Sequence, residues 1–206
     1  MRILAVSDVV VPSLYPRIDK RRFGRIDLLL GCGDLPPEYL THLAHVFDVP
    51  LFYVKGNHDI RYGESPPRGC RDIHERVVRF EGLKFMGLEG SMWYNGGPHQ
   101  YTEKQMARKI RQLRPTIWWR RGVDIVVTHA PPQGIHDGQD LCHRGFSCFR
   151  RLIQTQRPAF FIHGHIHRLF TNESARRTIA GETCIINSYG YTILETNRVG
   201  LDQKAD

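Results

Sequence analysis

Short, continuous apolar runs alternate along this chain with longer segments in which apolar residues recur every three or four positions. Continuous runs are typical of strands that are buried on both faces, and the longer period is typical of amphipathic helices. The predicted strands span residues 2–6, 26–33, 50–56, 76–80, 83–90, 124–130, 159–164, 183–188 and 191–196. The predicted helices span residues 37–47, 102–119 and 146–156, with a break considered at Pro115.

The order of these elements predicts an α/β fold with mixed sheets. A helix separates some of the early strands, which favours parallel β-α-β units, whereas the late strands follow each other directly, which favours antiparallel pairing. Glu81-Gly82 stands between two strands and predicts a tight hairpin. No internal repeat or linker interrupts the pattern, so we expect one domain over residues 1–206.

Composition narrows the class of protein. The 206 residues are 41% hydrophobic and 24% charged, as in ordinary soluble globular proteins. No apolar run reaches the ~20 residues of a membrane span, and the N-terminus lacks the pattern of a secretory signal. Five cysteines without a C-x-x-C pair predict reduced thiols. We therefore expect a cytoplasmic protein without membrane association.

The net charge of +8 comes partly from two basic stretches, residues 17–25 and 108–121. Basic charge attracts phosphate-bearing partners. The simplest interpretation is two solvated helix faces, with Trp118 and Trp119 packed against the protein. Nucleic acid stays open as a partner but is not favoured.

Polar side chains follow the apolar strands at the points where the strands end. Ligands of α/β sheets bind beyond the carboxyl ends of the strands, so these side chains are expected to meet in one crevice. Taken singly, an Asp there could cap a turn or a helix, and a His could be a core residue. The residues in question are Asp8, Asp34, Asn57, His129, His165 and His167.

This set of oxygen and nitrogen donors indicates a metal centre. Without a thiolate, it suits Mn²⁺, Fe, Zn²⁺ or Co²⁺ rather than Ca²⁺ or an iron–sulfur cluster. Gly33, Gly56 and Gly164 each precede a candidate ligand, as close backbone approach requires. His165 and His167 lie on one face of an extended segment. Ligands from several strand ends suit hydrolysis by two metal ions.

The motifs S-D-x-x, G-D, G-N-H-D, T-H-A-P and G-H-x-H occur in this order between Asp8 and His167. In this order the chain resembles the calcineurin-like metallophosphoesterase superfamily. The resemblance implies a four-layer α/β/β/α sandwich with two mixed sheets. It also implies hydrolysis of a phosphodiester or small phosphomonoester by a hydroxide that bridges two metal ions. One or two divalent ions per chain are expected, Mn²⁺ first, with Fe, Zn, Co or Ni as alternatives.

The resemblance also implies a role for each matching residue. Asp34 would bridge both ions, with Asn57, His129 and His165 completing the second site. Asp8 and His167 would belong to the first site. His58 would be the general acid that protonates the leaving group, and Asp59 would orient and charge His58.

One position departs from the family pattern. The family usually writes the first motif as D-x-H, but the third position here is Val10, which has no donor atom. Three alternatives stay open: water or substrate takes the vacant place, His99 or His136 replaces the ligand, or the first site is empty. Val10 also keeps a non-catalytic metal-binding or protein-binding scaffold on the same fold as the rival function. The family contains at least one such member, the retromer scaffold subunit.

The remaining candidates surround this set. His163 has the same parity as His165 but lies outside the motif, which indicates a supporting role. The loop with His136, Asp137 and Asp140 could contact substrate, and Arg144 could hold a phosphate. Trp93 and Tyr94 could stack a base or a ring.

Overall fold

The computed structural model describes residues 1–196 and has two large mixed sheets. The first sheet has the strand order β13-β1-β2-β3-β4, and the second has the order β11-β12-β10-β9-β6-β5. The strands of the first sheet are β1 (Arg2–Ser7), β2 (Leu28–Gly31), β3 (Leu51–Tyr53), β4 (Cys70–Asp72) and β13 (Gly190–Glu195). The strands of the second sheet are β5 (Arg76–Phe80), β6 (Leu83–Leu88), β9 (Ile125–Thr128), β10 (Phe160–His163), β11 (Arg177–Ala180) and β12 (Thr183–Asn187).

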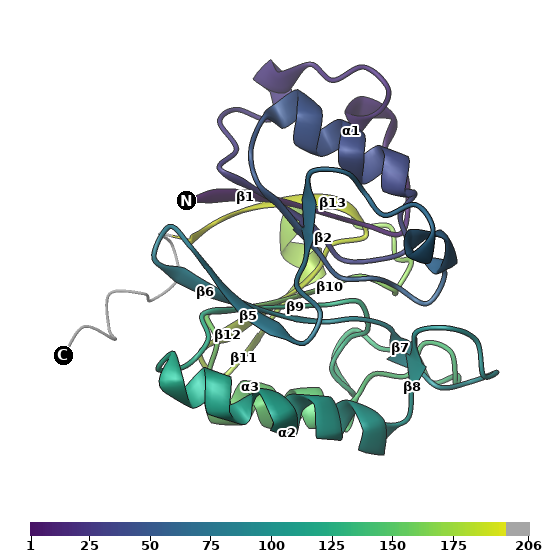
Figure 1. Cartoon of the computed structure of the whole chain (residues 1–206), viewed down its shortest axis with the longest axis vertical. Coiled ribbons are helices and arrows are strands. Elements are labelled where there is room, and N and C mark those ends of the chain that lie inside the picture. Colours follow the sequence, from purple (N-terminus) through teal and green to yellow (C-terminus); the bar gives the residue numbers. More distant parts are fainter. Residues whose placement is uncertain (197–206) are drawn as a thin grey trace.

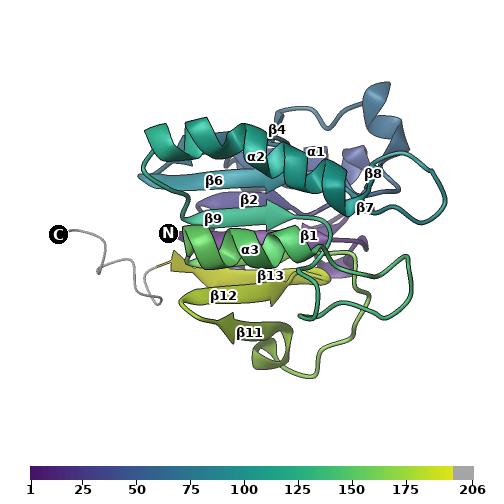
Figure 2. The ribbon, with the colours of Figure 1, turned by 90° about the horizontal axis from the view of Figure 1, so that it is seen from below.

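Within residues 1–196, three α-helices cover the outer faces of the sheets. They are α1 (Pro37–Phe47), α2 (Glu103–Trp119) and α3 (Ser147–Gln156). Figure 1 shows α1 on one side of the sandwich and α2 and α3 on the other, and in Figure 2 α2 and α3 lie side by side. The α/β/β/α order of layers confirms the expected fold class. A small ribbon of β7 (Ser91–Met92) and β8 (Gln100–Tyr101) leads into α2.

Alternate residues of the central strands supply different layers of the core. Ile3 and Ala5 of β1 pack between the two sheets, whereas Leu4 and Val6 pack under α1. The strands β9 and β10 divide their side chains in the same way between the sheets and the α2–α3 layer. Burial on both faces explains why these strands appear in the sequence as continuous apolar runs.

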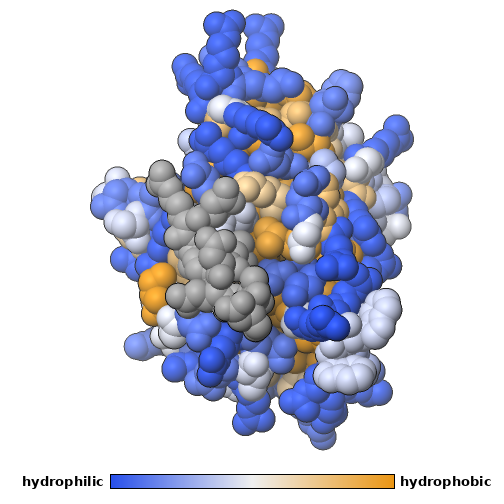
Figure 3. All heavy atoms as spheres, turned by 90° about the vertical axis from the view of Figure 1, so that its left-hand side faces the viewer, coloured by the Kyte–Doolittle hydropathy of each residue, from blue (hydrophilic) through white to orange (hydrophobic). Residues whose placement is uncertain are grey.

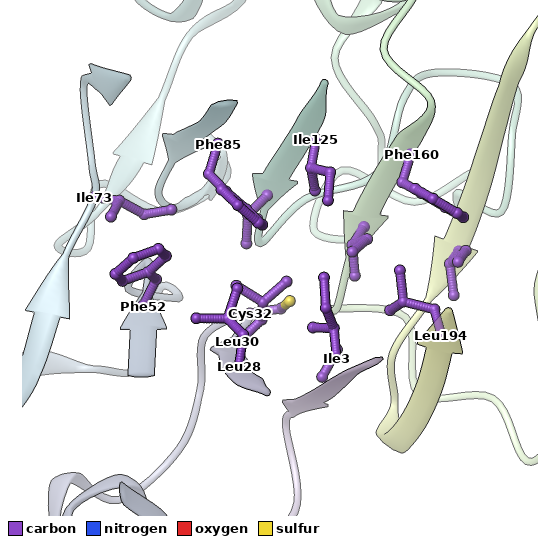
Figure 4. Close-up of a cluster of buried hydrophobic side chains, with 14 of the residues drawn as sticks. Ile3, Leu28, Leu30, Cys32, Phe52, Ile73, Phe85, Ile125, Phe160 and Leu194 are labelled. Atoms are coloured by element: carbon purple, nitrogen blue, oxygen red, sulfur yellow. The ribbon is translucent and has the colours of Figure 1, made fainter. Parts of the chain in front are cut away.

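The layer between the sheets contains a large cluster of buried apolar side chains. Figure 4 shows Phe85, Ile125 and Phe160 from the second sheet facing Leu30 and Ile3 from the first. All five side chains are almost fully buried. This layer joins the sheets and thereby sets the relation between the strand ends that carry the candidate ligands.

Most of the predicted elements are confirmed. The helix at 37–47 has the predicted bounds, and α2 continues through Pro115 to Trp119 without a break. The strands β5 and β6 form the predicted hairpin, with positive φ at Glu81 and Gly82. The short strands β4, β7, β8 and β11 were not predicted, because each has few residues and little periodic pattern to identify it.

Two expectations were wrong. The late strands are not uniformly antiparallel, since β12 pairs with β10 in parallel and only β11 and β13 pair antiparallel with their neighbours. Trp118 and Trp119 do not pack into the protein, because their side chains are 83% and 73% exposed. The buried face of α2 is formed instead by Met106, Leu113 and Ile117. No helix among residues 1–196 is long and apolar enough to cross a membrane.

Truncation of Leu30 tests the inter-sheet layer. Leu30→Ala should lower the free energy of unfolding by roughly 2–5 kcal/mol, because it leaves a cavity at a fully buried position. Leu141→Ala, at a side chain that is 59% exposed, is the matched control and should change it by less than about 0.5 kcal/mol. Urea denaturation measures both values, and equal losses would contradict this description of the core.

Candidate metal centre

The six candidate ligands meet at one end of the sandwich, and each sheet contributes three of them. Asp8, Asp34 and Asn57 follow β1, β2 and β3, and the three histidines follow β9 and β10. The backbone N–H of His165 donates to both carboxylate oxygens of Asp8, at 2.9 and 3.1 Å. Asp34 Oδ2 lies 3.3 Å from His129 Nε2. These contacts join the two sheets where the strands end.

The orientation of the His129 ring is set by a backbone carbonyl. His129 Nδ1 lies 2.9 Å from the carbonyl oxygen of Cys32, and because a carbonyl only accepts, Nδ1 must donate. The other nitrogen, Nε2, faces two oxygen atoms, Asn57 Oδ1 at 3.1 Å and Asp34 Oδ2. His129 is fully buried, so this arrangement presents a nitrogen and two oxygens to one enclosed point.

The His165 ring is oriented through its other nitrogen, Nε2, whereas His129 is oriented through Nδ1. Its Nε2 lies 2.7 Å from the carbonyl oxygen of Cys142 and must donate to it, which leaves Nδ1 free. One ligand atom each from Asp34, His129 and His165 can be chosen so that all lie within 4.8 Å of one another. Metal-binding histidines usually donate their second N–H to a carbonyl or carboxylate, which fixes the ring and its tautomer. The donor set therefore fits a divalent cation.

Without a metal ion, a proton on His129 balances the negative charge of the Asp34 carboxylate. A bound cation could take the place of that proton. Burial disfavours the charged form of His129, but the Asp34 carboxylate beside it raises the pKa of the imidazole to about 9. Burial likewise opposes ionisation of Asp34, yet His129 and the N–H of His58 lower the pKa of that carboxyl. Burial and the nearby His129 lower the pKa of His165 to about 4, so its ring is neutral at pH 7. A cation would displace the proton of His129, as metal binding to histidine requires.

The region of the first expected site is less complete. His167 Nε2 lies 3.5 Å from Asp8 Oδ1, and this hydrogen bond raises the pKa of His167. Val10 is half-buried and packs against the apolar cluster under α1. The His167 ring also stacks on Tyr189, with centroids 5.1 Å apart. This end of the centre thus offers Asp8, Asp34 and His167 but no imidazole at position 10.

Neither expected replacement for the missing ligand faces this site. His99 Nδ1 bonds Glu89 Oε1 at 3.1 Å. His136 lies between His163 Nε2, at 2.9 Å, and the hydroxyl of Thr178, at 2.8 Å. Both rings are thus engaged elsewhere, which removes one of the three alternatives for the first site. His163 is fully buried and supports the loop before His165.

The Asp59 carboxylate was expected to contact the His58 ring, but its hydrogen-bond partners are backbone N–H groups. Its carboxylate accepts the backbone N–H groups of Asp34, Leu35 and Gly56, at 2.8, 3.0 and 2.7 Å. Both carboxylate oxygens are therefore engaged by backbone, and the residue joins the loop after β2 to the loop after β3. Burial raises the pKa of Asp59 to about 6 against these donors. His58 is exposed, and its backbone N–H donates to Asp34 Oδ1 at 2.8 Å.

The close approach expected at the glycines is confirmed. A Cβ at Gly33, where φ is +93°, would lie 2.5 Å from His129 Nδ1, and a Cβ at Gly56 would lie 2.0 Å from Asp34 Oδ1. Three candidate ligands also have a left-handed backbone, with φ of 66° at Asp8, 56° at Asp34 and 67° at His165. Such conformations are uncommon outside glycine and concentrate at functional sites, where the surrounding contacts hold them.

Sequence reasoning missed the two backbone carbonyls that support the centre and found other groups around it without their contacts. The carbonyls of Cys32 and Cys142 orient the two imidazoles, and any residue type could supply them. The Tyr94 hydroxyl accepts a hydrogen bond from Nδ2 of the candidate ligand Asn57 at 3.3 Å. Asp140, Cys142 and His143 form a second, partly exposed group of possible ligand atoms beside His165. Arg144 is exposed next to that group.

Comparisons with known proteins agree with this geometry. A family model described as calcineurin-like phosphoesterase matches residues 1–169. Metallophosphoesterase domain-containing protein 1 of Homo sapiens is 23% identical over 199 residues, which cover 77% of this chain and 60% of that protein. The Mus musculus protein of the same name matches equally. The chain thus spans 60% of the length of the curated relatives it matches.

Solved structures share the fold at low sequence identity. TT1561 of Thermus thermophilus has a TM-score of 0.66 at 17% identity, covering 94% of this chain and 93% of that one. The calcineurin-like phosphoesterase YfkN from Bacillus subtilis has a TM-score of 0.54 at 13% identity, covering 94% and 83%.

A methyl group at Gly56 tests the crowding of the centre. Gly56→Ala should lower the free energy of unfolding by about 3 kcal/mol and prevent a divalent cation from binding at this donor set, because its Cβ would overlap both the Asp34 carboxylate and backbone. Gly63→Ala is the matched control, since its Cβ would meet nothing within 4 Å. Denaturation and metal analysis measure both effects. A Gly56→Ala protein with the same free energy of unfolding and the same metal content as the Gly63→Ala control would refute the described packing.

Proposed function

The chain belongs to the calcineurin-like phosphoesterase family, and we propose that it hydrolyses a phosphodiester or a small phosphomonoester. Family membership supports a metal-dependent phosphoesterase in general. The observation that carries the proposal for this chain is the pair of oriented imidazoles. His129 and His165 each donate one N–H to a backbone carbonyl, and a ligand atom of each can lie within 4.8 Å of the Asp34 carboxylate.

We propose that two cation sites share Asp34. Asn57, His129 and His165 would complete one of them with three further donors, and Asp8 and His167 would complete the other with two. The first metal site is then the weaker one, because Val10 adds no ligand and water or substrate must fill the place. Mn²⁺ is the proposed ion, since oxygen and imidazole donors without a thiolate suit it. Bound divalent ions would lower the pKa of water and neutralise phosphoryl oxygens.

His58 is the proposed general acid. Its ring is exposed at the rim of the centre, where a leaving group can reach it, and its backbone N–H is held by Asp34. A cationic imidazole at this place can give a proton to a departing alkoxide. Asp59 then acts as a positioning residue, since its carboxylate holds the backbone of Asp34 and Gly56 rather than the His58 ring.

A non-catalytic scaffold is the second candidate function, and Val10 is the observation that favours it. A protein that serves only as a scaffold would retain the fold but could lose ligands of the first cation site, such as the one missing at Val10. The exposed His58 and the intact set around His129 favour the enzyme, because a protein-binding role has no need of either. All five cysteines are free, which agrees with the proposed cytoplasmic location.

Restoring the missing ligand tests the proposed weak site. Val10→His should raise the affinity for the first ion by about tenfold or more and bring metal content to two ions per chain at lower Mn²⁺. Val9→His, an adjacent and more exposed position, is the matched control. Asp34→Ala should lose both ions. Metal analysis after dialysis measures occupancy. A Val10→His protein that holds no more Mn²⁺ than Val9→His would contradict the assignment of the first site.

The role of His58 predicts a dependence on the leaving group. His58→Asn should lower kcat by roughly 10²–10⁴ for a phosphodiester with a poor leaving group. The loss should be much smaller for bis-p-nitrophenyl phosphate, because p-nitrophenolate departs without a proton. Metal content should not change. His45→Asn, at an exposed position on α1, is the control. An equal loss with both substrates would exclude general-acid catalysis by His58.

A further inference from the structure

The outer helical layer has a groove lined by arginines. The helices α2 and α3 lie side by side over the second sheet (Figure 2). The groove between them measures about 600 Å³ and is lined by Arg111 and Arg114 from α2 and by Arg150 and Arg151 from α3. Figure 3 shows that the lower part of the molecule, where this layer lies, is largely hydrophilic. These arginines include part of the basic stretch 108–121.

Along α2 the positive charges form a stripe that ends in an aromatic ring. Residues three, four or seven apart lie on one helix face, and the stripe consists of Lys104, Arg108, Arg111, Arg114 and Trp118. All five side chains are exposed, and Trp118 is 83% exposed. At 1.5 Å per residue, the stripe is about 21 Å long. The Trp118 ring, at the end of this positively charged stripe, is exposed to solvent and has no packing role within residues 1–196.

The positive charge of the groove is not neutralised from within residues 1–196. Arg111, Arg114 and Arg151 have no ion-pair partner among these residues. The one acidic residue that lines the groove, Glu103, accepts from the Ser147 N–H, the Ser147 hydroxyl and the Cys148 N–H, and so caps α3.

The other basic stretch of the chain is different. Arg21 and Arg22 both lie within 4.0 Å of Asp19, and Arg25 pairs with Asp27 at 2.7 Å. No exposed tryptophan stands in this stretch. This stretch is therefore also basic but has neither the α2–α3 groove nor an exposed tryptophan, and it serves as a comparison within the same molecule.

We propose that the α2–α3 groove binds single-stranded nucleic acid, with the backbone phosphates on the arginines and a base stacked on Trp118. Guanidinium groups match phosphate geometry, and a row of them follows a polyanion. An exposed indole offers a stacking surface that unpaired bases can use and paired bases cannot. A lipid surface fits less well, because the apolar face of α2 is buried in the core and cannot enter a bilayer.

The groove is separate from the metal centre. The helix α2 precedes β9, and β9 ends at the centre, so Trp118 lies toward the opposite end of the sheet. Binding there does not depend on the proposed hydrolysis. It can be measured in EDTA, where metal-dependent cleavage is absent, and the two proposals can therefore fail independently.

The test is binding of a fluorescein-labelled oligouridylate, followed by anisotropy in EDTA over a range of salt concentrations. Arg111→Gln, Arg114→Gln and Arg151→Gln combined should make the slope of log affinity against log salt less steep by about 2 and should weaken binding roughly 100-fold at 0.1 M salt. Lys20→Gln, Arg21→Gln and Arg22→Gln combined remove the same charge from the other stretch and should have a much smaller effect. Circular dichroism verifies the fold of each variant.

Trp118 separates a nucleic acid from other polyanions. Trp118→Ala should weaken oligouridylate binding by roughly fivefold or more, whereas Trp118→Phe should retain most of it. Heparin, which lacks bases, should bind equally to all three proteins. The proposal is overturned if the two triple variants lose affinity equally, if Trp118→Ala binds oligouridylate as the native protein does, or if a duplex of the same length binds more tightly. It is overturned also if only phosphatidylserine vesicles bind.

Discussion

Two hydrogen bonds from imidazole N–H groups to backbone carbonyls decide what the centre of this molecule can bind. The Cys32 carbonyl, at the end of β2, takes the Nδ1 proton of His129, and the Cys142 carbonyl takes the Nε2 proton of His165. Each ring is left with one nitrogen for a ligand. Because the first bond crosses from one sheet to the other, the packing of the two sheets and the chemistry of the site depend on each other. Breaking such a buried bond costs about 1–3 kcal/mol and frees the ring to turn.

The loops around the centre contain residues with an unfavourable left-handed backbone, and hydrogen bonds from neighbouring residues stabilise this conformation. Asp34 has a left-handed backbone, and the Asp59 carboxylate binds its N–H together with the N–H of Gly56. The absence of a side chain at Gly56 lets the Asp34 carboxylate approach that backbone. A substitution at any of these residues acts on the others through direct contact. The proposed function depends on this crossing of loops, and Val10 lies beside it without a donor atom, packed against the apolar cluster under α1.

Much of the fold and the position of the site could be predicted from the sequence, because strands buried on both faces produce continuous apolar runs and the polar residues after them are local. The same reasoning could not find the supporting contacts. His129 and Cys32 are 97 positions apart, and Asp8 and His165 are 157 apart, so no periodic pattern connects them. The partners of Asp59, His99 and His136 likewise depend on which loops meet. The exposure of Trp118 was missed because its helix has a basic and an apolar face, and sequence alone placed the ring on the wrong one.

Anomalous X-ray diffraction from crystals of the Mn²⁺-loaded protein would show directly whether the two oriented imidazoles bind a metal ion. We expect a strong manganese peak bonded to Nε2 of His129, Nδ1 of His165 and the Asp34 carboxylate, with both carbonyl hydrogen bonds intact. A weaker peak should lie near Asp8 and His167. A strong peak at Asp140, Cys142 and His143 with none at Asp34, or a His165 ring turned to bind through Nε2, would contradict this expectation.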